Sequence, residues 1–209
     1  MKNYLHDMLA ANQILLTDEI EAKLIAYLDL LHQWNKVFNL TAIRDEKQSI
    51  VLHVLDSLSI HEYVGGTHIL DVGSGAGLPG IPLALAFPDK QFVLLDSNSK
   101  KTRFLRQVMY ELNLKNIDVV HARCEQFQTE KKFDTILSRA FASIKVMLEI
   151  TQHLLAQQGQ FLLMKGVYPE DEIREIPDKF KLLGVQRLEI KGLDAQRHLV
   201  LIGANTWEK

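Results

Sequence analysis

The sequence predicts an α/β protein in which an N-terminal helical cap precedes a mainly parallel β-sheet that ends in an antiparallel hairpin. In the first third of the 209 residues, apolar side chains recur at helical spacing. Short apolar runs then alternate with amphipathic segments, as they do in βαβ units. The last two apolar runs are separated by too few residues for a crossover helix. We assign residues 1–66 to the cap and residues 67–209 to the core, within one integrated domain.

The cap is predicted to contain two amphipathic helices. Asp18 and Glu21 resemble a capping box and mark the start of the first helix. Its apolar stripe contains Ile20, Leu24, Leu28 and Leu31. The second helix is expected over residues 46–63, and the pair of glycines that follows is expected to end it. The polar and aromatic segment 34–41 is expected to join the two helices.

The core is predicted to contain strands that alternate with helices. The expected strands cover residues 68–72, 91–95, 117–121, 133–137, 160–164, 185–190 and 198–202. The expected helices cover residues 78–87, 99–112 and 143–155. This alternation predicts a parallel sheet that is buried on both faces. Only residues 191–197 separate the last two strands, so these strands are expected to be antiparallel.

Composition restricts the class of protein. Apolar residues make up 47% of the chain and charged residues 24%, which excludes an intrinsically disordered chain. The 24 basic and 26 acidic residues give a net charge of −2, so nucleic acid would need a local basic patch. The single cysteine, Cys124, excludes an internal disulfide and a zinc site built from several thiolates. No apolar run has the length of a membrane span, and residues 1–20 do not resemble a secretory signal. We expect a cytoplasmic monomer that needs neither a membrane nor a metal.

The glycine-rich segment after the first core strand is the most informative part of the sequence. It runs from Asp71 to Gly80 and leads from a strand into a helix, where parallel sheets bind ligands. Its alternate glycines exceed the needs of a tight turn without a ligand. The spacing from Gly75 to Gly80 matches a dinucleotide fingerprint, but its register is wrong because the strand ends at Val72. Asp71 would also repel a pyrophosphate, whereas it suits the positively charged S-adenosylmethionine.

Two further strand ends carry side chains that suit this ligand. Asp96 ends the second strand, where its carboxylate can accept hydrogen bonds from both ribose hydroxyls. The alternative, that Asp96 caps the next helix, is weaker because residues 97–99 offer other caps. Cys124 and Glu125 follow the third strand, where the adenine edge would meet the loop. Nothing nearby in the sequence would activate Cys124 as a nucleophile, so we interpret it as loop lining.

The motif Asp-x-Gly-x-Gly-x-Gly at residues 71–77, with an acidic residue at position 96, resembles the class I S-adenosylmethionine-dependent methyltransferases. Further blocks narrow the resemblance, and they are Trp34-Asn35 with Asn39-Leu40-Thr41, His53 with Asp56-Ser57-Leu58, Asp71–Pro82, Leu95-Asp96-Ser97 with Lys100-Lys101, Ser138-Arg139-Ala140-Phe141, Lys165-Gly166 and Arg197-His198-Leu199-Val200. In this order and spacing, over nearly the whole chain, they resemble the glucose-inhibited division protein B family. Its members are bacterial enzymes that methylate guanine N7 at one site in 16S small-subunit ribosomal RNA.

The resemblance implies a Rossmann-like fold with a seven-stranded sheet, S-adenosylmethionine as the cofactor, and small-subunit rRNA or the 30S particle as the partner. The cofactor contacts that it implies are Gly73, Gly75, Leu78, Asp96, Cys124, Glu125 and Arg139. The residue patterns by themselves also indicate the loops that hold these residues, except for the loop that contains Arg139.

Guanine N7 carries a lone pair and no proton, so its methylation requires alignment with the methyl group and the sulfur rather than a general base. Asp56 and Arg139 are the candidate catalytic residues. A carboxylate such as Asp56 would stabilise the cationic product, and Asp56 lies three residues after His53 on the same helix face. Alternatively, His53 and Asp56 pair with each other or with the segment that joins the cap helices.

A basic rim around the cleft is the predicted RNA contact. Its candidates are Lys100, Lys101, Arg103 and Arg106 on one helix, with Lys165 and Arg197 at strand ends or loops. The alternative for Arg103 and Arg106 is an ordinary solvated helix face. The acidic stretch from Glu170 to Asp178 is expected to face away from RNA.

Two other functions stay open at this point. One is a class I methyltransferase that acts on a small molecule or a protein. The other is a non-catalytic ribosome-binding or assembly factor that retains the methyltransferase fold. Binding of S-adenosylmethionine separates either enzyme from a pure binding protein.

Overall fold

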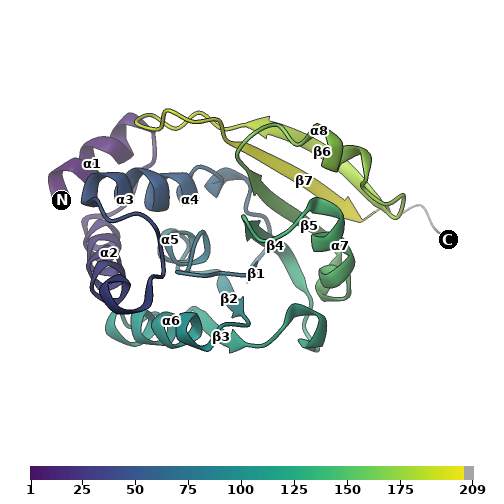
Figure 1. Cartoon of the computed structure of the whole chain (residues 1–209), viewed down its shortest axis with the longest axis horizontal. Helices are drawn as coiled ribbons and strands as arrows, with labels where there is room; N and C mark the ends of the chain where they lie inside the picture. Colours follow the sequence, from purple (N-terminus) through teal and green to yellow (C-terminus); the bar gives the residue numbers. More distant parts are fainter. Residues whose placement is uncertain (205–209) are drawn as a thin grey trace.

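The computed structural model describes residues 1–204 of the chain. A seven-stranded mixed sheet forms the centre of this part (Figure 1). The strand order is β3-β2-β1-β4-β5-β7-β6. The strands are β1 (His68–Val72), β2 (Gln91–Asp96), β3 (Ile117–His121), β4 (Phe133–Arg139), β5 (Leu155–Lys165), β6 (Phe180–Arg187) and β7 (His198–Ala204). Strands β1 to β5 pair in parallel, and β7 lies antiparallel between β5 and β6. The predicted fold class is confirmed. Residues 205–209, which the prediction includes in the core, lie outside the described part.

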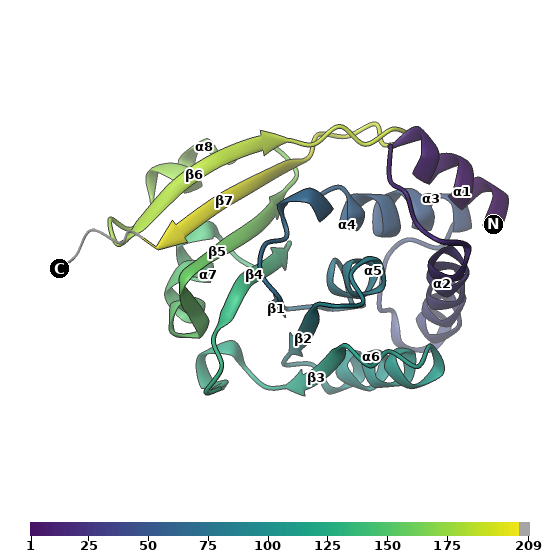
Figure 2. The same cartoon turned by 180° about the vertical axis from the view of Figure 1, so that it is seen from behind.

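Helices cover both faces of this sheet. The helices are α1 (Lys2–Ala11), α2 (Asp18–Phe38), α3 (Glu46–Ser49), α4 (Asp56–Leu58), α5 (Gly80–Ala86), α6 (Ser99–Glu111), α7 (Ile144–Thr151) and α8 (Glu170–Arg174). One hydrophobic cluster joins the cap helices to α5, α6 and one face of the sheet, and a second cluster packs α7 on the other face. Figure 2 shows α1 to α4 gathered on one side of the molecule, with β5 to β7 on the other. Within residues 1–204, no helix combines the length and apolar character needed to cross a membrane. The sequence patterns did not predict α1 or α8.

The first of the two predicted cap helices corresponds to α2, which starts and ends differently from the prediction. The Thr17 hydroxyl, and not Asp18, acts as the N-cap and accepts from the backbone amide three residues later at 3.4 Å. The helix continues to Phe38, so most of the segment expected to be a junction is helical. Trp34 stabilises this last turn, because its ring packs against Phe38 and against Phe104 of α6, with ring centroids 5.2 and 5.7 Å away.

The second cap segment is helical over most of the predicted range, but its helix type changes along the way. α3 leads into a π-helical turn, Ile50–Leu55, which leads into α4 and then a 3₁₀ turn, His61–Tyr63. π-helical turns inside helices often occur at functional sites. Asp56, the first residue after this turn, belongs to the site described below.

The sixth strand lies earlier in the chain than predicted, at Phe180–Arg187 instead of residues 185–190. Leu188 and Ile190, which suggested the strand, are each 8% exposed and belong to the hydrophobic cluster that contains the cap. Beyond them, the Lys191 amide donates to Asn12 Oδ1 at 2.8 Å. Figure 1 shows this segment reaching from β6 to the end of α1. These apolar residues are therefore buried because they pack near the cap, not because they belong to the sheet.

Candidate active site

The loop between β1 and α5 places its glycines in a backbone conformation that other residues rarely adopt. Gly73, Gly75 and Gly77 have φ angles of 68°, 60° and 91°, in the left-handed region that favours glycine. A Cβ atom on Gly73 would lie 2.3 Å from the ring of Phe141. The Gly73 amide donates to the carbonyl of Leu95 at 2.8 Å, which holds the loop against the end of β2. The loop therefore presents bare backbone at the carboxyl edge of the sheet.

Asp71 faces the protein interior instead of a ligand, which corrects our expectation. Its side chain is completely buried, and Oδ2 accepts a hydrogen bond from the Gly80 amide at 3.0 Å. Oδ1 has no hydrogen-bond partner among the described residues. Burial raises the pKa of the Asp71 carboxyl to about 7. Asp71 thus anchors the start of α5 behind the glycine loop.

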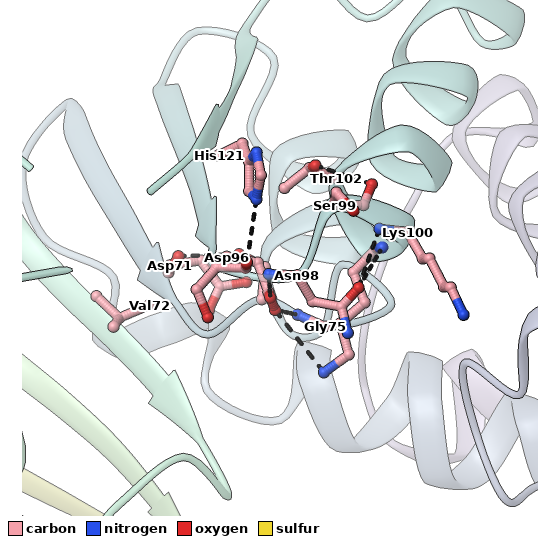
Figure 3. A network of polar contacts seen from close by, with 12 residues as sticks. Asp71, Val72, Gly75, Asp96, Asn98, Ser99, Lys100, Thr102 and His121 are labelled. Carbon is pink, nitrogen blue, oxygen red and sulfur yellow. Dashed lines mark hydrogen bonds and ion pairs between the residues drawn. The ribbon is translucent and has the colours of Figure 1, made fainter. Parts of the chain in front are cut away.

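Asp96 connects the end of β2 to the glycine loop (Figure 3). One carboxylate oxygen accepts from the Gly75 amide at 2.9 Å, and the other accepts from the Asn98 amide at 2.8 Å. The Lys101 ammonium lies 3.8 Å from the same carboxylate. Asn98, and not Asp96, caps α6, because its side chain accepts from the amides of Lys100 and Lys101. A carboxylate offers about four acceptor sites, so Asp96 can accept further hydrogen bonds from a ligand.

The first cavity has a volume of about 390 Å³ and lies at the carboxyl ends of β1 to β4. Its lining residues are Val72, Gly73, Leu95, Asp96, Ser97, Asn98, Lys101, Ala122, Arg123, Cys124, Glu125, Ala140 and Phe141. Four of the expected cofactor contacts are among them: Gly73, Asp96, Cys124 and Glu125. Gly75 donates a hydrogen bond to Asp96 but does not line the cavity itself. Leu78 is buried in the hydrophobic cluster that contains the cap helices, and it lines neither this cavity nor the second cavity described below.

Cys124 lacks the environment of a nucleophile. Burial is the main cause that raises the pKa of its thiol, to about 11. Its Sγ donates to a carboxylate oxygen of Glu125 at 3.4 Å. A hydrogen bond from the Glu125 backbone amide is the main cause that lowers the pKa of the Glu125 carboxyl. The geometry agrees with the interpretation of Cys124 as loop lining and leaves Glu125 as a charged acceptor at the cavity.

A second cavity, of about 450 Å³, shares the lining residue Ala140 with the first one. Its lining residues are Ile43, Leu52, His53, Asp56, Arg139, Ala140, Met164, Lys165, Gly166 and Arg197. Ala140, directly after β4, lines both cavities and adopts a φ of 52°. Arg139, which we expected at the cofactor, lines the second cavity and not the first. The residues at the end of β4 therefore contribute to the lining of both cavities.

Asp56 is held between two arginines in the second cavity. Its Oδ2 accepts from Arg139 Nη1 and its Oδ1 accepts from Arg197 Nε, both at 2.8 Å. The Asp56 side chain is only 2% exposed. Arg139 Nη1 also donates to the carbonyl of Leu52 at 3.0 Å. These charges tie the cap to β4 and to the start of β7. A guanidinium group has five N–H donors, so both arginines retain donors for a ligand.

His53 and Asp56 do not pair with each other. His53 Nε2 lies 3.0 Å from the Thr41 hydroxyl, in the segment that joins the cap helices, so for His53 the alternative of a pairing with this segment is the one observed. Its Nδ1 has no hydrogen-bond partner among the described residues. Burial, reinforced by the charge of Arg139, lowers the pKa of His53 to about 4. The imidazole is therefore neutral at physiological pH.

One residue of the acidic stretch 170–178 pairs with Lys165, which lines the second cavity. Glu172, on α8, forms an ion pair with Lys165 at 2.8 Å and accepts from the Ile144 amide at 2.6 Å. The Lys165 ammonium also donates to the carbonyl of Ala142 at 3.1 Å. The charge of Lys165, one of the expected RNA contacts, is thus largely neutralised within the protein.

The basic residues of α6 have different surroundings. Lys101 lines the first cavity beside Asp96, whereas Lys100 and Arg103 are exposed and line neither cavity. Arg106 donates to the carbonyl of Val119 on β3 at 3.3 Å. The helix therefore contributes Lys101 to the site and presents Lys100 and Arg103 to solvent.

Several lining residues escaped the sequence reasoning. Ile43, Leu52 and Met164 are apolar residues without a distinguishing pattern, and only their place in the fold brings them to the second cavity. Ala140 and Phe141 lie inside the block that contains Arg139, so this block was the signal that could have identified them. Among residues 1–204, no group of three or more His, Cys, Asp or Glu side chains could hold a metal ion.

Comparisons with known proteins agree with this geometry. Residues 20–200 match the family described as rRNA small subunit methyltransferase G. The ribosomal RNA small subunit methyltransferase G of Idiomarina loihiensis is 45% identical over 202 residues, which cover 97% of this chain and 98% of that protein. The protein of the same name from Escherichia coli is 47% identical over 205 residues, which cover 98% of this chain and 99% of that protein.

Solved structures with low sequence identity share the fold. Magnesium protoporphyrin IX methyltransferase from Synechocystis, determined with bound S-adenosylmethionine, has a TM-score of 0.62 at 15% identity, over 91% of this chain and 99% of that chain. TrmN from Thermus thermophilus has a TM-score of 0.55 at 20% identity, over 71% of this chain and 47% of that chain. The described fold is thus that of the class I methyltransferases.

Proposed function

The chain belongs to the rRNA small subunit methyltransferase G family, and we propose that it transfers a methyl group from S-adenosylmethionine to N7 of a guanosine in 16S rRNA. The observation that carries this proposal is that two chemically different cavities share the lining residue Ala140. The first cavity has the carboxylate and bare backbone of a nucleoside site. The second has the cations and apolar surface that a guanine base requires. A methyl group would pass between the two ligands near Ala140.

The first cavity suits S-adenosylmethionine. Asp96, already oriented by Gly75 and Asn98, offers its carboxylate to the two ribose hydroxyls. Glu125 and the backbone beside it would meet the adenine edge, and the bare backbone of Gly73 would allow the methionine part to approach the sheet. When bound, the cofactor supplies a methyl group that its sulfonium charge activates.

The second cavity suits a guanine base that has been turned out of its RNA strand. Ile43, Leu52 and Met164 offer apolar surface to the faces of the base. Arg139 and Arg197 offer N–H donors to O6, the acceptor beside N7 on the same edge of guanine. Their bonds to Asp56 fix both guanidinium groups before a base arrives, so donors on O6 would also orient N7.

The reaction does not require a residue of the second cavity to remove a proton, because N7 has a lone pair and no hydrogen. Alignment of the reacting atoms is worth up to about 7–11 kcal/mol of the barrier. His53 is neutral and buried, and Asp56 is engaged by two arginines, so both side chains are set to hold structure. We therefore assign Asp56 and Arg139 to the positioning of the base and not to acid–base catalysis.

We propose that the partner of the site is ribosomal RNA, either free or within the 30S particle, and that the protein acts in the cytoplasm. The electrostatic attraction for RNA is local, since the whole chain carries a net charge of −2.

The test is methyl transfer from labelled S-adenosylmethionine to small-subunit RNA that lacks the modification, offered both as free RNA and as 30S particles. The product is digested to nucleosides and separated. We expect the label in 7-methylguanosine, and we expect Asp96→Ala to lower its yield. Label in a different nucleoside would contradict the N7 assignment. Tight binding to the particle without any transfer would instead support the non-catalytic assembly factor.

A further inference from the structure

Two large apolar side chains stand exposed beside the second cavity. Val167 is 72% exposed and Tyr168 is 53% exposed. They follow Lys165 and Gly166, which line the second cavity, on the loop after β5. Neither side chain lines the cavity itself. Exposed apolar surface that adjoins a binding cavity indicates contact with a further part of the ligand.

The protein holds this loop in place from several sides. The carbonyl of Gly166 lies 3.0 Å from His198 Nδ1. The rings of Tyr168 and His198 meet at an interplanar angle of 86°, with centroids 5.7 Å apart. An edge-on contact of this kind leaves at least one face of the Tyr168 ring uncovered by His198. The next residue, Pro169, is buried. Tyr168 is therefore a positioned ring with an open face.

The charges around this loop favour a nucleic acid. His198 directly follows Arg197, which lines the second cavity together with Arg139. The nearest acidic residues in the sequence, Glu170 and Asp171, both form ion pairs with Arg174. Arg174 balances only one of these two carboxylates, so an RNA strand would approach from the side of the cavity, where Arg139 and Arg197 lie.

We propose that Tyr168, with Val167, forms a second base subsite on which a nucleotide adjacent to the target guanosine stacks. This inference rests on the proposed function, because it assumes that the target guanine occupies the second cavity. A base turned out of an RNA strand loses its stacking on its neighbours, and an aromatic face restores stacking to the neighbouring base. Stacking accepts any base, so Tyr168 adds affinity and register and leaves the choice of guanine to the cavity.

The test compares Tyr168→Ala, Tyr168→Phe and a matched control, Tyr110→Ala. Tyr110 is 80% exposed at the far end of α6 and lines neither cavity. Filter binding measures the affinity for small-subunit RNA that lacks the modification, and titration calorimetry measures the affinity for S-adenosylmethionine. We expect Tyr168→Ala to weaken RNA binding by about tenfold, within the range for loss of one base–aromatic stack. Tyr168→Phe and Tyr110→Ala should stay within about twofold of wild type, and all three should bind the cofactor normally.

A spectroscopic readout separates stacking from a structural role. Once the methylated guanosine is mapped, 2-aminopurine is placed on each side of it in a synthetic RNA. Its fluorescence should be quenched by wild type and Tyr168→Phe on one side, and not by Tyr168→Ala. Equal RNA affinity for Tyr168→Ala and wild type would overturn the inference, as would a loss in Tyr168→Phe as large as in Tyr168→Ala. If the wild-type chain transfers no methyl group to RNA, the proposed function fails instead, and the two failures remain distinct.

Discussion

The two cavities that share Ala140 are built in different ways. The first takes all its lining residues from the core, at the carboxyl ends of four parallel strands. The second combines the cap segment 43–56 with the ends of β4 and β5 and with Arg197, just before β7. A site at the strand ends comes with the sheet itself, whereas the second site exists only because the cap is docked beside it. The proposed cofactor site thus depends on the sheet alone, and the proposed acceptor site depends on the docking of the cap on the sheet.

The two cavities also differ in the charged groups around their carboxylates. In the first cavity the Asp96 carboxylate has one ammonium, that of Lys101, at 3.8 Å. In the second, the Asp56 carboxylate has two guanidinium groups at 2.8 Å. The first arrangement leaves acceptors for the hydroxyls of a cationic ligand, and the second leaves donors for the oxygen of a neutral base. The substitutions at Gly73, Asp56 and Asp96 should each disturb one cavity and spare the other.

The largest effect is expected behind the first cavity, at Asp71. Its folded-state pKa, about 7, lies above the ordinary value of 3.8, so the folded state binds the extra proton between these values. Stability is therefore lost as the pH rises from about 4 to 7, by at most about 4 kcal/mol. Asp71→Asn removes this loss. Urea unfolding of both proteins across this pH range should show the wild type weakening relative to the variant, while parallel profiles would contradict the assignment.

Gly73→Val should abolish the use of the first cavity while leaving the second intact. A valine would be strained at a φ of 68°, and its Cβ would meet the Phe141 ring at 2.3 Å. We expect S-adenosylmethionine binding to weaken by more than about hundredfold, or about 2.7 kcal/mol, as measured by calorimetry. Gly184→Val is the control, since nothing lies within 4 Å of its Cβ position. Normal cofactor affinity in Gly73→Val with a native circular dichroism spectrum would refute the role of this loop.

Asp56→Ala should disable the second cavity and spare the first. Removal of the carboxylate leaves Arg139 and Arg197 without their shared partner, and both arginines are 22% exposed, so water compensates in part. We expect the free energy of unfolding to fall by about 2–3 kcal/mol, below the range for a fully buried pair. Methyl transfer to RNA should fall by at least tenfold while the cofactor affinity stays within about threefold. A cofactor affinity that falls as much as the transfer rate would mean that the cavities are not separate.

Asp96→Ala should impair the first cavity and spare the second. Loss of the hydrogen bonds from the ribose hydroxyls to a charged acceptor should cost about 1.5–3 kcal/mol of cofactor affinity. RNA affinity, measured by filter binding, should remain near that of the wild type. If the cofactor affinity stays within about twofold, Asp96 serves only to hold the glycine loop and Asn98.

The smallest effects should distinguish two neighbouring lysines. Lys101→Ala should lower the cofactor affinity by a few fold, because its ammonium lies beside Asp96 in the first cavity. Lys100→Ala should leave the cofactor unaffected and, if it contacts a phosphate, should reduce the salt dependence of RNA binding by about one counterion. Calorimetry and filter binding across a salt series measure the two properties. Identical behaviour of the two variants would remove the distinction that the structure makes.

The residues of the first cavity were easier to predict from the sequence than those of the second. Gly73, Asp96, Cys124 and Glu125 could be placed because each lies at, or a few residues after, the carboxyl end of a recognisable strand of a parallel sheet. Asp71 was misjudged since a strand end does not reveal which face its side chain occupies, and this one turns inward. In the fold, the β-strand pattern misplaced the sixth strand, because apolar residues at 188 and 190 are buried against the cap, and it missed the first residues of β5, which begins at Leu155.

The second cavity could be predicted only residue by residue. Asp56, Arg139 and Arg197 stood out as charged residues in distinctive blocks, but their mutual contacts join segments more than 80 residues apart in the chain. No local pattern encodes such contacts, because they depend on how the cap docks on the sheet. The neutralisation of Lys165 by Glu172 is a similar case, since α8 was not expected to be a helix that reaches the site.

The most direct test of the two-cavity account is a crystal structure of the chain with S-adenosylhomocysteine and a short RNA that carries the target guanosine. The account predicts the ribose at Asp96, the adenine beside Glu125, and the guanine in the second cavity with O6 at Arg139 or Arg197. The sulfur of the cofactor product and N7 of the guanine should face each other near Ala140. A guanine bound in the first cavity, or outside the second one, would contradict the account.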